Sequence, residues 1–174
     1  RESEELEREV ERVLRELEEL VKRLHDDVRR VDEELDRKVR DLHKKVRDVL
    51  RRVEKLVRDG RDAREIRKEL EDAHERHRRM LEKIEDEARK SHEDHKKVLE
   101  DIKRRAEEIL KKLRDENLED RVVDRLRRKI EEIARRLRKS NEDHRRSLKE
   151  IKDKLEESNE RLRRALEEIA ERLR

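Results

Sequence analysis

Residues 6–56 read LEREVERVLRELEELVKRLHDDVRRVDEELDRKVRDLHKKVRDVLRRVEKL, with apolar side chains recurring every third or fourth position. The mean spacing of about 3.6 residues is that of one face of an α-helix. We therefore predict a helix over residues 4–58, with Ser3 as its N-cap and Gly60 as the left-handed residue that ends it. The predicted apolar face comprises Leu6, Val10, Val13, Leu17, Leu20, Leu24, Val28, Val31, Leu35, Val39, Leu42, Val46, Val49, Val53 and Leu56.

The same apolar spacing recurs twice more along the chain. Asp62 is suited to cap a second helix over residues 63–115, and a break at Asn117 precedes a third helix over residues 119–173. Because both connections are short, consecutive helices must fold back on each other. The sequence therefore predicts an all-α fold, an antiparallel up-down-up three-helix bundle that forms a single domain over residues 1–174.

The predicted apolar face is narrow, close to two residues in seven, which is typical of a coiled-coil-like helix that contacts two partners. The other apolar residues are scattered, and they include Leu14, Val21, Leu50, Leu81, Leu99 and Val123, while Val98 falls on the predicted face. Without a second apolar stripe we expect a monomer that requires no partner, with a homo-oligomer as the alternative. Long helices of about 83 Å should run nearly straight, because a repeat of 18 residues needs little supercoiling.

Composition excludes several classes of function. The chain has 55 Lys and Arg against 52 Asp and Glu, so its net charge is only +3 although 61% of the residues are charged. Interleaved acids and the absence of aromatic residues argue against a nucleic-acid partner. No apolar run approaches the roughly 18 residues of a membrane span, and no targeting signal is visible, so we expect a soluble protein with no membrane partner. Arg1 as the first residue suggests that a leader or tag was removed or omitted.

The uncharged polar residues repeat with a spacing of 18 residues. The pairs are His25 and His43, His74 and His92, His77 and His95, Ser140 and Ser158, and Asn141 and Asn159. Eighteen residues are five helical turns, so the members of a pair point the same way from one helix and lie about 27 Å apart.

Folding at the two turns gathers these residues into two buried layers. The first layer is predicted to hold His25, Ser91, His92, His95, Ser140, Asn141 and His144, with Ser147 as a further candidate. The second layer is predicted to hold His43, His74, His77, Ser158 and Asn159. A neutral imidazole has one donor and one acceptor, so histidines beside Ser and Asn can complete a buried hydrogen-bond network.

Local motifs repeat between the layers: SHEDH at 91–95, SNEDH at 140–144, AHERH at 73–77 and SNERL at 158–162. With its equal helices, short capped loops and Glu/Lys/Arg surfaces, the whole chain resembles de novo designed, parametrically generated helical bundles with modular buried hydrogen-bond networks. Such networks often use Gln and Thr, which are absent here. This resemblance implies a structural scaffold with no natural biochemical function and no enzymatic activity. Natural spectrin-like repeats are the alternative, but they usually contain core aromatic residues.

Acid response is one functional consequence of buried histidine layers. Protonation turns the acceptor nitrogen into a donor and brings charge into a desolvated layer, so burial should lower the histidine pKa. The use of histidine resembles the subset of designed networks meant to respond to pH.

Metal binding is the alternative function. His25, His95 and His144 would offer one imidazole from each helix for Zn(II), with an open fourth position. The second layer lacks this set, because Leu162 stands where His144 would repeat. No other cofactor is predicted. Ser91 and His95 are spaced like a nucleophile and its base, but no oxyanion hole accompanies them, so no catalytic residue is predicted.

Overall fold

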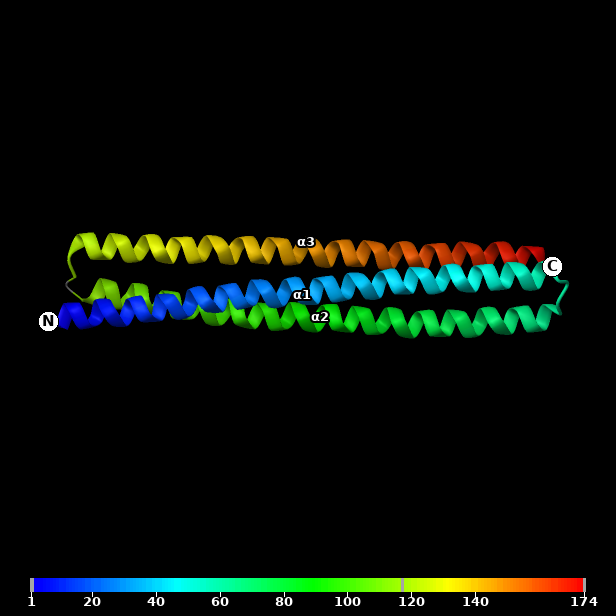
Figure 1. Cartoon of the computed structure of the whole chain (residues 1–174), viewed down its shortest axis with the longest axis horizontal. Coiled ribbons are helices and arrows are strands. Elements are labelled where there is room, and N and C mark those ends of the chain that lie inside the picture. Colours follow the sequence, from blue (N-terminus) through cyan, green and yellow to red (C-terminus); the bar gives the residue numbers. More distant parts are fainter. Residues whose placement is uncertain (1, 117, 174) are drawn as a thin grey trace. The chain divides into compact units, whose positions relative to one another are not determined.

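The computed structural model describes residues 2–116 and 118–173, and three long helices account for nearly all of them. They are α1 (Glu2–Arg58), α2 (Ala63–Asp115) and α3 (Asp120–Arg172) (Figure 1). No strand occurs within the described ranges. The all-α prediction is confirmed, and the predicted helix bounds differ from those observed by at most two residues.

Gly60 ends α1 in the way its sequence position predicts. Its φ of 68° lies in the left-handed region, where a residue without Cβ is favoured. The amide of Gly60 donates to the carbonyl of Val57 at 3.2 Å, and the amide of Arg61 donates to the carbonyl of Leu56 at 3.1 Å. These two bonds define a Schellman motif, which satisfies carbonyls that the last turn of a helix leaves free.

Asp62 caps α2, as predicted, because its Oδ1 accepts a hydrogen bond from the amide of Arg64 at 3.2 Å. The prediction for Ser3 was wrong, since α1 already begins at Glu2 and Ser3 lies within the helix. A glutamate is favourable at the positive end of a helix, which allows the helix to start earlier. The prediction for Asn117 falls outside the described residues.

Replacing Gly60 with Ala should lower the free energy of unfolding by about 1 kcal/mol, because a residue with Cβ is strained at positive φ. A Cβ atom at this position would meet no other atom within 4 Å, so steric contact adds nothing to the loss. Denaturant unfolding measures the effect. Gly60→Asn is the matched control and should lose less, since Asn tolerates the left-handed region; equal stability of all three proteins would contradict the expectation.

Contacts divide the chain into two compact units, and each unit contains one segment of every helix. Unit 1 comprises Arg1–Val31 and Ser91–Arg146, and unit 2 comprises Asp32–Lys90 and Ser147–Arg174. Within each unit, the helical segments joined by a turn run antiparallel. The prediction that all 174 residues form one domain stays a prediction.

The core of unit 1 includes apolar residues from all three helices. Its buried members are Val10, Leu14, Leu17, Val21, Leu24, Val28, Leu99, Ile102, Ile109, Leu113, Leu126, Ile130, Ile133 and Leu137. In unit 2, Val53 and Ile66 near the first turn are buried with Leu70 and Ile169. Side chains of this kind supply most of the free energy that stabilises a small bundle.

Two details of the predicted apolar face were wrong. Three apolar residues outside the predicted face belong to the core and are at most 9% exposed, namely Leu14, Val21 and Leu99. Val98, which lies on the predicted face, is 36% exposed. Neighbouring helix positions differ by about 100°, so either of two adjacent apolar residues can face the core, and packing against two other helices decides which one does. Val13 packs against the same core while only partly buried, so the apolar face is wider than predicted.

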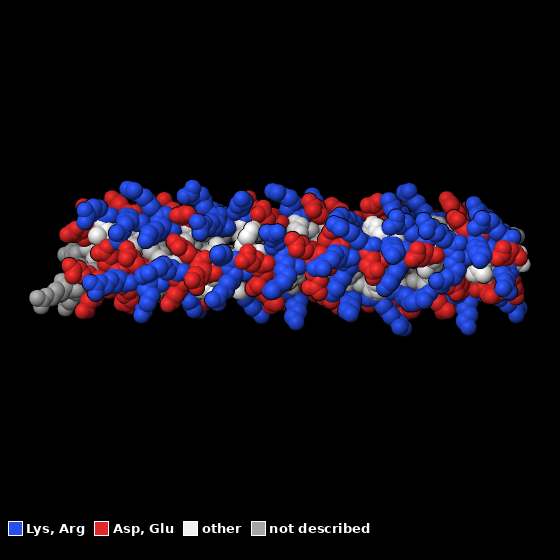
Figure 2. Space-filling view, viewed as in Figure 1, with Lys and Arg blue, Asp and Glu red and all other residues white. Residues whose placement is uncertain are grey.

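Charged side chains of both signs alternate over the face shown in Figure 2. Several connect helices within a unit. In unit 1, Arg125 pairs with Glu7 and Glu11. In unit 2, Lys154 donates to Asp36 at 2.7 Å, and this hydrogen bond lowers the pKa of the Asp36 carboxyl below its ordinary value. Within the described residues, no helix contains a stretch apolar enough to span a membrane.

Candidate functional site

The centre of unit 2 holds a buried histidine–serine pair. His77 on α2 is 5% exposed and Ser158 on α3 is 1% exposed, and His77 Nε2 lies 3.2 Å from Ser158 Oγ in a hydrogen bond. Both residues lie on helix faces whose other members are mainly Leu, Ile and Ala, and these side chains cannot form hydrogen bonds. A buried polar group usually requires a hydrogen-bond partner.

His43 approaches the same level from α1. Its Nε2 lies 3.1 Å from the carbonyl oxygen of Lys154, which can only accept a hydrogen bond, so the imidazole proton of His43 resides on Nε2. His43 is half-buried, and the bond links α1 to α3. The second predicted layer is therefore formed by His77, Ser158 and His43, each from a different helix.

Burial lowers the pKa of His77 below its ordinary value of 6.5. Desolvation is the main cause, and the positive charges that His74 and His43 carry when protonated lower it further. The neutral imidazole is thus the form that the folded unit favours. Protonation would place a charge between helices, where the neighbouring groups are a serine and two other histidines. Among the described residues, no carboxylate forms a hydrogen bond with His77.

Unit 1 contains the equivalent pair, eighteen residues away in the sequence. His95 on α2 is 2% exposed, Ser140 on α3 is 3% exposed, and His95 Nε2 lies 3.5 Å from Ser140 Oγ. The bond is longer than that of His77 with Ser158 and lies at the limit of hydrogen-bonding distance. The predicted repeat of one polar arrangement is present in both units.

A stack of imidazole rings distinguishes the level in unit 1. His144 on α3 has no exposed surface, and its ring centroid lies 4.7 Å from that of His95 with the planes tilted by 30°. It also stacks on His92, at 5.9 Å and 21°. Nδ1 of His92 is buried and forms no hydrogen bond with any of the described residues, so the predicted network is incomplete at this atom.

Three predicted members of the buried layers are in fact exposed: His25, His74 and Asn159. The prediction that these three residues are buried was wrong. Each follows a buried residue directly, as His25 follows Leu24, and is turned by about 100° away from the core. Five further candidates are half-buried, namely His43, Ser91, His92, Asn141 and Ser147. Among the described residues, the buried polar side chains are therefore those of the two histidine–serine pairs and of His144.

The predicted three-histidine metal face does not form. His25 is exposed, whereas His95 and His144 are buried with their rings against each other. Among residues 2–116 and 118–173, no group of three or more His, Asp or Glu side chains is placed to hold a metal ion. His25 lines the same surface cavity as Ser140, the partner of His95, but its own side chain is exposed.

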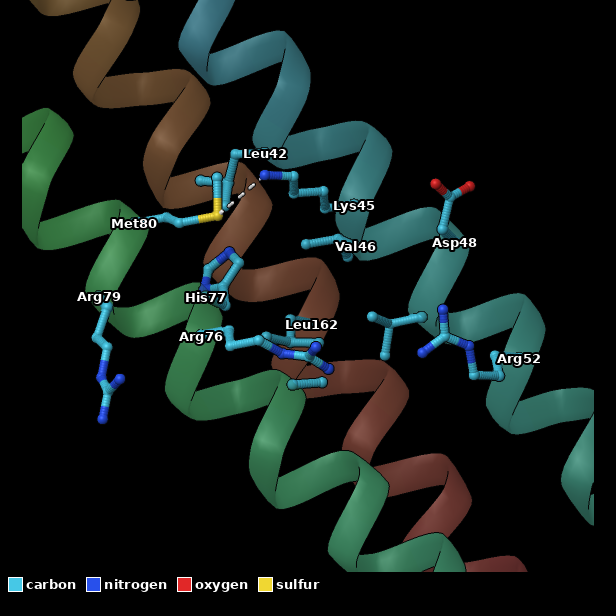
Figure 3. A pocket seen from close by; sticks show the side chains of 12 residues that line it. Leu42, Lys45, Val46, Asp48, Arg52, Arg76, His77, Arg79, Met80 and Leu162 are labelled. Atoms are coloured by element: carbon cyan, nitrogen blue, oxygen red, sulfur yellow. Dashed lines mark hydrogen bonds between the residues drawn. The ribbon is translucent and has the colours of Figure 1, made fainter.

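A cavity that was not predicted from the sequence lies beside His77 in unit 2 (Figure 3). Its volume is about 480 Å³, and Met80 and Ala73 of α2 are among its lining residues. Ala73 occupies the position where the other level has Ser91, so its side chain lacks one hydroxyl there.

The chain matches no protein family model and no curated protein sequence. Among solved structures, a chain described as a computationally designed three-helix bundle is similar, with 16% sequence identity and a TM-score of 0.41. The match covers 99% of this chain and 87% of that chain. Because its TM-score is below 0.5, the fold described above rests on the helices of this chain alone.

Proposed function

We propose that the chain is a designed structural scaffold without enzymatic activity, in which buried histidine–serine pairs make the stability dependent on pH. The observation that carries the proposal is the pair of His77 and Ser158, buried and 3.2 Å apart, together with its counterpart His95 and Ser140. Two similar pairs occur eighteen residues apart on the same helices. Such a repeat is typical of a designed sequence in which one polar arrangement is used twice on a regular helical backbone.

A scaffold is favoured over an enzyme by the surroundings of these residues. Ser158 and Ser140 are 1% and 3% exposed, so a substrate could not reach either hydroxyl without opening the unit. Their histidine partners come from a neighbouring helix and contact other buried side chains. A nucleophile needs access and an oxyanion-binding group, and neither accompanies these pairs in the described residues.

The pH dependence is favoured over a structural role alone because burial between the helices favours the neutral imidazole of His77. The imidazole can bond to the Ser hydroxyl through a nitrogen that donates or one that accepts. Protonation to imidazolium, however, also places a positive charge at the buried position. The lowered pKa of His77 has this origin.

Denaturant unfolding at pH 7.5 and pH 4.5, each with and without Zn(II), tests the proposal. We expect a lower midpoint at pH 4.5 and no effect of Zn(II) at pH 7.5, since a metal bound by the folded state would raise the midpoint by mass action. Sedimentation equilibrium on the same samples should give the mass of one chain. Equal midpoints at both pH values would contradict the acid response, and a rise with Zn(II) would favour a metal-binding function.

A further inference from the structure

The cavity beside His77 has the dimensions of a small-molecule site. Its volume of about 480 Å³ falls within the range of roughly 300 to 1,000 Å³ that ligand pockets occupy. Leu42 and Val46 of α1, Met80 of α2 and Leu162 of α3 provide apolar lining (Figure 3). Leu42 and Leu162 are 1% and 2% exposed, so this lining is continuous with the core of unit 2.

Basic residues dominate the charged lining of the cavity. Lys45, Arg52, Arg76 and Arg79 line it, against the single carboxylate of Asp48. Three of these cations have acidic partners: Lys45 pairs with Asp41, Arg52 with Glu69, and Arg79 with Glu75. Arg76 has no ion pair with any residue in the described part of the chain. In Figure 3 Arg76 is directed into the space between α2 and α1, whereas Arg79 points away from it.

Lys45 adds a second positive charge at the mouth of the cavity. Its Nζ lies 3.9 Å from the sulfur of Met80, as the dashed line in Figure 3 shows, so the ammonium reaches from α1 towards α2. Apolar side chains inside and cations at the edge are arranged as in a site for a molecule with one apolar and one anionic part.

The basic character of the cavity is not a consequence of the eighteen-residue repeat. The equivalents of the five charged lining residues at the other histidine level are Asp27 for Lys45, Glu34 for Arg52, Asp94 for Arg76, Lys97 for Arg79 and Arg30 for Asp48. The equivalent positions therefore carry three acids and two bases, where the cavity has one acid and four bases. The apolar lining also changes, because His144 replaces Leu162.

We propose that this cavity binds a small amphipathic anion, with the apolar body against Leu42, Met80 and Leu162 and the anionic group beside Arg76. Burying the apolar body removes its surface and that of the cavity from water. The anionic group gains a charge-assisted hydrogen bond from a guanidinium that has no other ion pair to give up. A cation with the same apolar body would gain the burial of that body but would meet the guanidinium of Arg76 instead of gaining a hydrogen bond from it.

The fluorescent sulfonate 1-anilinonaphthalene-8-sulfonate is a suitable probe. The chain contains no aromatic residue, so its fluorescence is measured without protein background, and Met80 is its only methionine, so the ¹³C-methyl resonance reports on this cavity alone. At pH 7.5 we expect saturable fluorescence with one site per chain, and a shift of the Met80 methyl resonance with the same midpoint. A methyl resonance that stays in place while fluorescence saturates would overturn the proposal.

Two comparisons test the role of charge. Arg76→Gln should weaken binding of the sulfonate by about fivefold or more, a modest factor because the site is partly open to water. Lys97→Gln makes the same change of net charge at an exposed position of the other level and should leave the affinity unchanged. N-phenyl-1-naphthylamine, which lacks the sulfonate, should bind more weakly than the probe. Equal affinity of the two dyes, or of wild type and Arg76→Gln, would overturn the assignment of the anionic group.

Discussion

Replacing His95 with Leu is expected to lower the free energy of unfolding at pH 7.5 by about 1 to 3 kcal/mol, although leucine is the more apolar residue. The loss arises from what His95 leaves behind. Ser140 is 3% exposed and would lose the imidazole 3.5 Å away, and His144 would lose the ring that lies 4.7 Å from its own. Urea or guanidinium unfolding followed by circular dichroism measures the change.

Two further variants separate the hydrogen bond from general effects of the substitution. Adding Ser140→Ala to His95→Leu should recover much of the stability, because an apolar pair leaves no polar group unsatisfied. His25→Leu is the matched control: it makes the same chemical change at an exposed histidine of α1 and should shift stability by no more than about 0.5 kcal/mol. Should His95→Leu alone stabilise the protein at pH 7.5, the pair with Ser140 would not be a stabilising bond.

The fold was predictable because its signals are local. Apolar spacing over residues 6–56 gives the helix directly, and Gly60 with Asp62 specifies how that helix ends and the next one begins. The backbone requires a left-handed residue there and a side-chain acceptor two residues later, and few residue types supply either. These constraints do not depend on the rest of the chain.

Positions at the edge of the helix face were not predictable to the same degree. Val98 and Leu99 are adjacent and both apolar, and only the packing of three helices decides that Leu99 faces inward. Adjacent positions on a helix are rotated by about 100°, and His25 lies one position beyond a buried residue. It is therefore exposed to solvent, whereas His95 is buried. The level along a helix follows from counting residues, whereas the side of the helix depends on contacts that the sequence does not state.

The polar contacts at the two histidine levels were predictable only in part. The histidine–serine pairs follow from the repeat of 18, because both members lie on the predicted apolar faces or directly beside them. The stack of His92, His144 and His95 depends on ring orientation, which side-chain torsions determine. The cavity beside Met80 depends on how side chains of all three helices pack in unit 2, which the spacing of residues in the sequence does not specify.

Acid is expected to weaken unit 2 in two separate ranges of pH. The first range belongs to His77, whose folded pKa lies below the 6.5 of the unfolded chain because it is buried. Above pH 6.5 imidazole is neutral in both states, so its contribution to stability is complete. As the pH falls below 6.5 the unfolded chain takes up a proton that the folded chain does not, and the free energy of unfolding falls until the folded pKa is passed. The slope can reach about 1.4 kcal/mol per pH unit for one such group.

The second range belongs to Asp36, whose pKa is lowered below 3.8 chiefly by the hydrogen bond from Lys154. For a carboxylate with a depressed folded pKa, the contribution is present above the ordinary value and is lost as the pH falls through the folded value. The effect should be small, because the pair lies near the surface. Asp36→Asn should remove the contribution of Asp36 to this lower range and leave the range below pH 6.5 intact. The exposed carboxyls of Glu75 and Glu160, whose pKa values are lowered by hydrogen bonds from Arg78 and Arg163, remain in the lower range.

A double variant isolates the range due to His77. His77→Leu with Ser158→Ala removes the titrating group together with its partner, so the free energy of unfolding should change less between pH 7.5 and pH 5 than in the wild type. Hydrogen exchange at pH 5 should show earlier opening of the wild-type backbone around His77 than around Val53 and Ile66, since apolar packing does not titrate. The helices should persist at room temperature for the same reason. An identical pH dependence in the wild type and the double variant would assign the acid response to groups other than this pair.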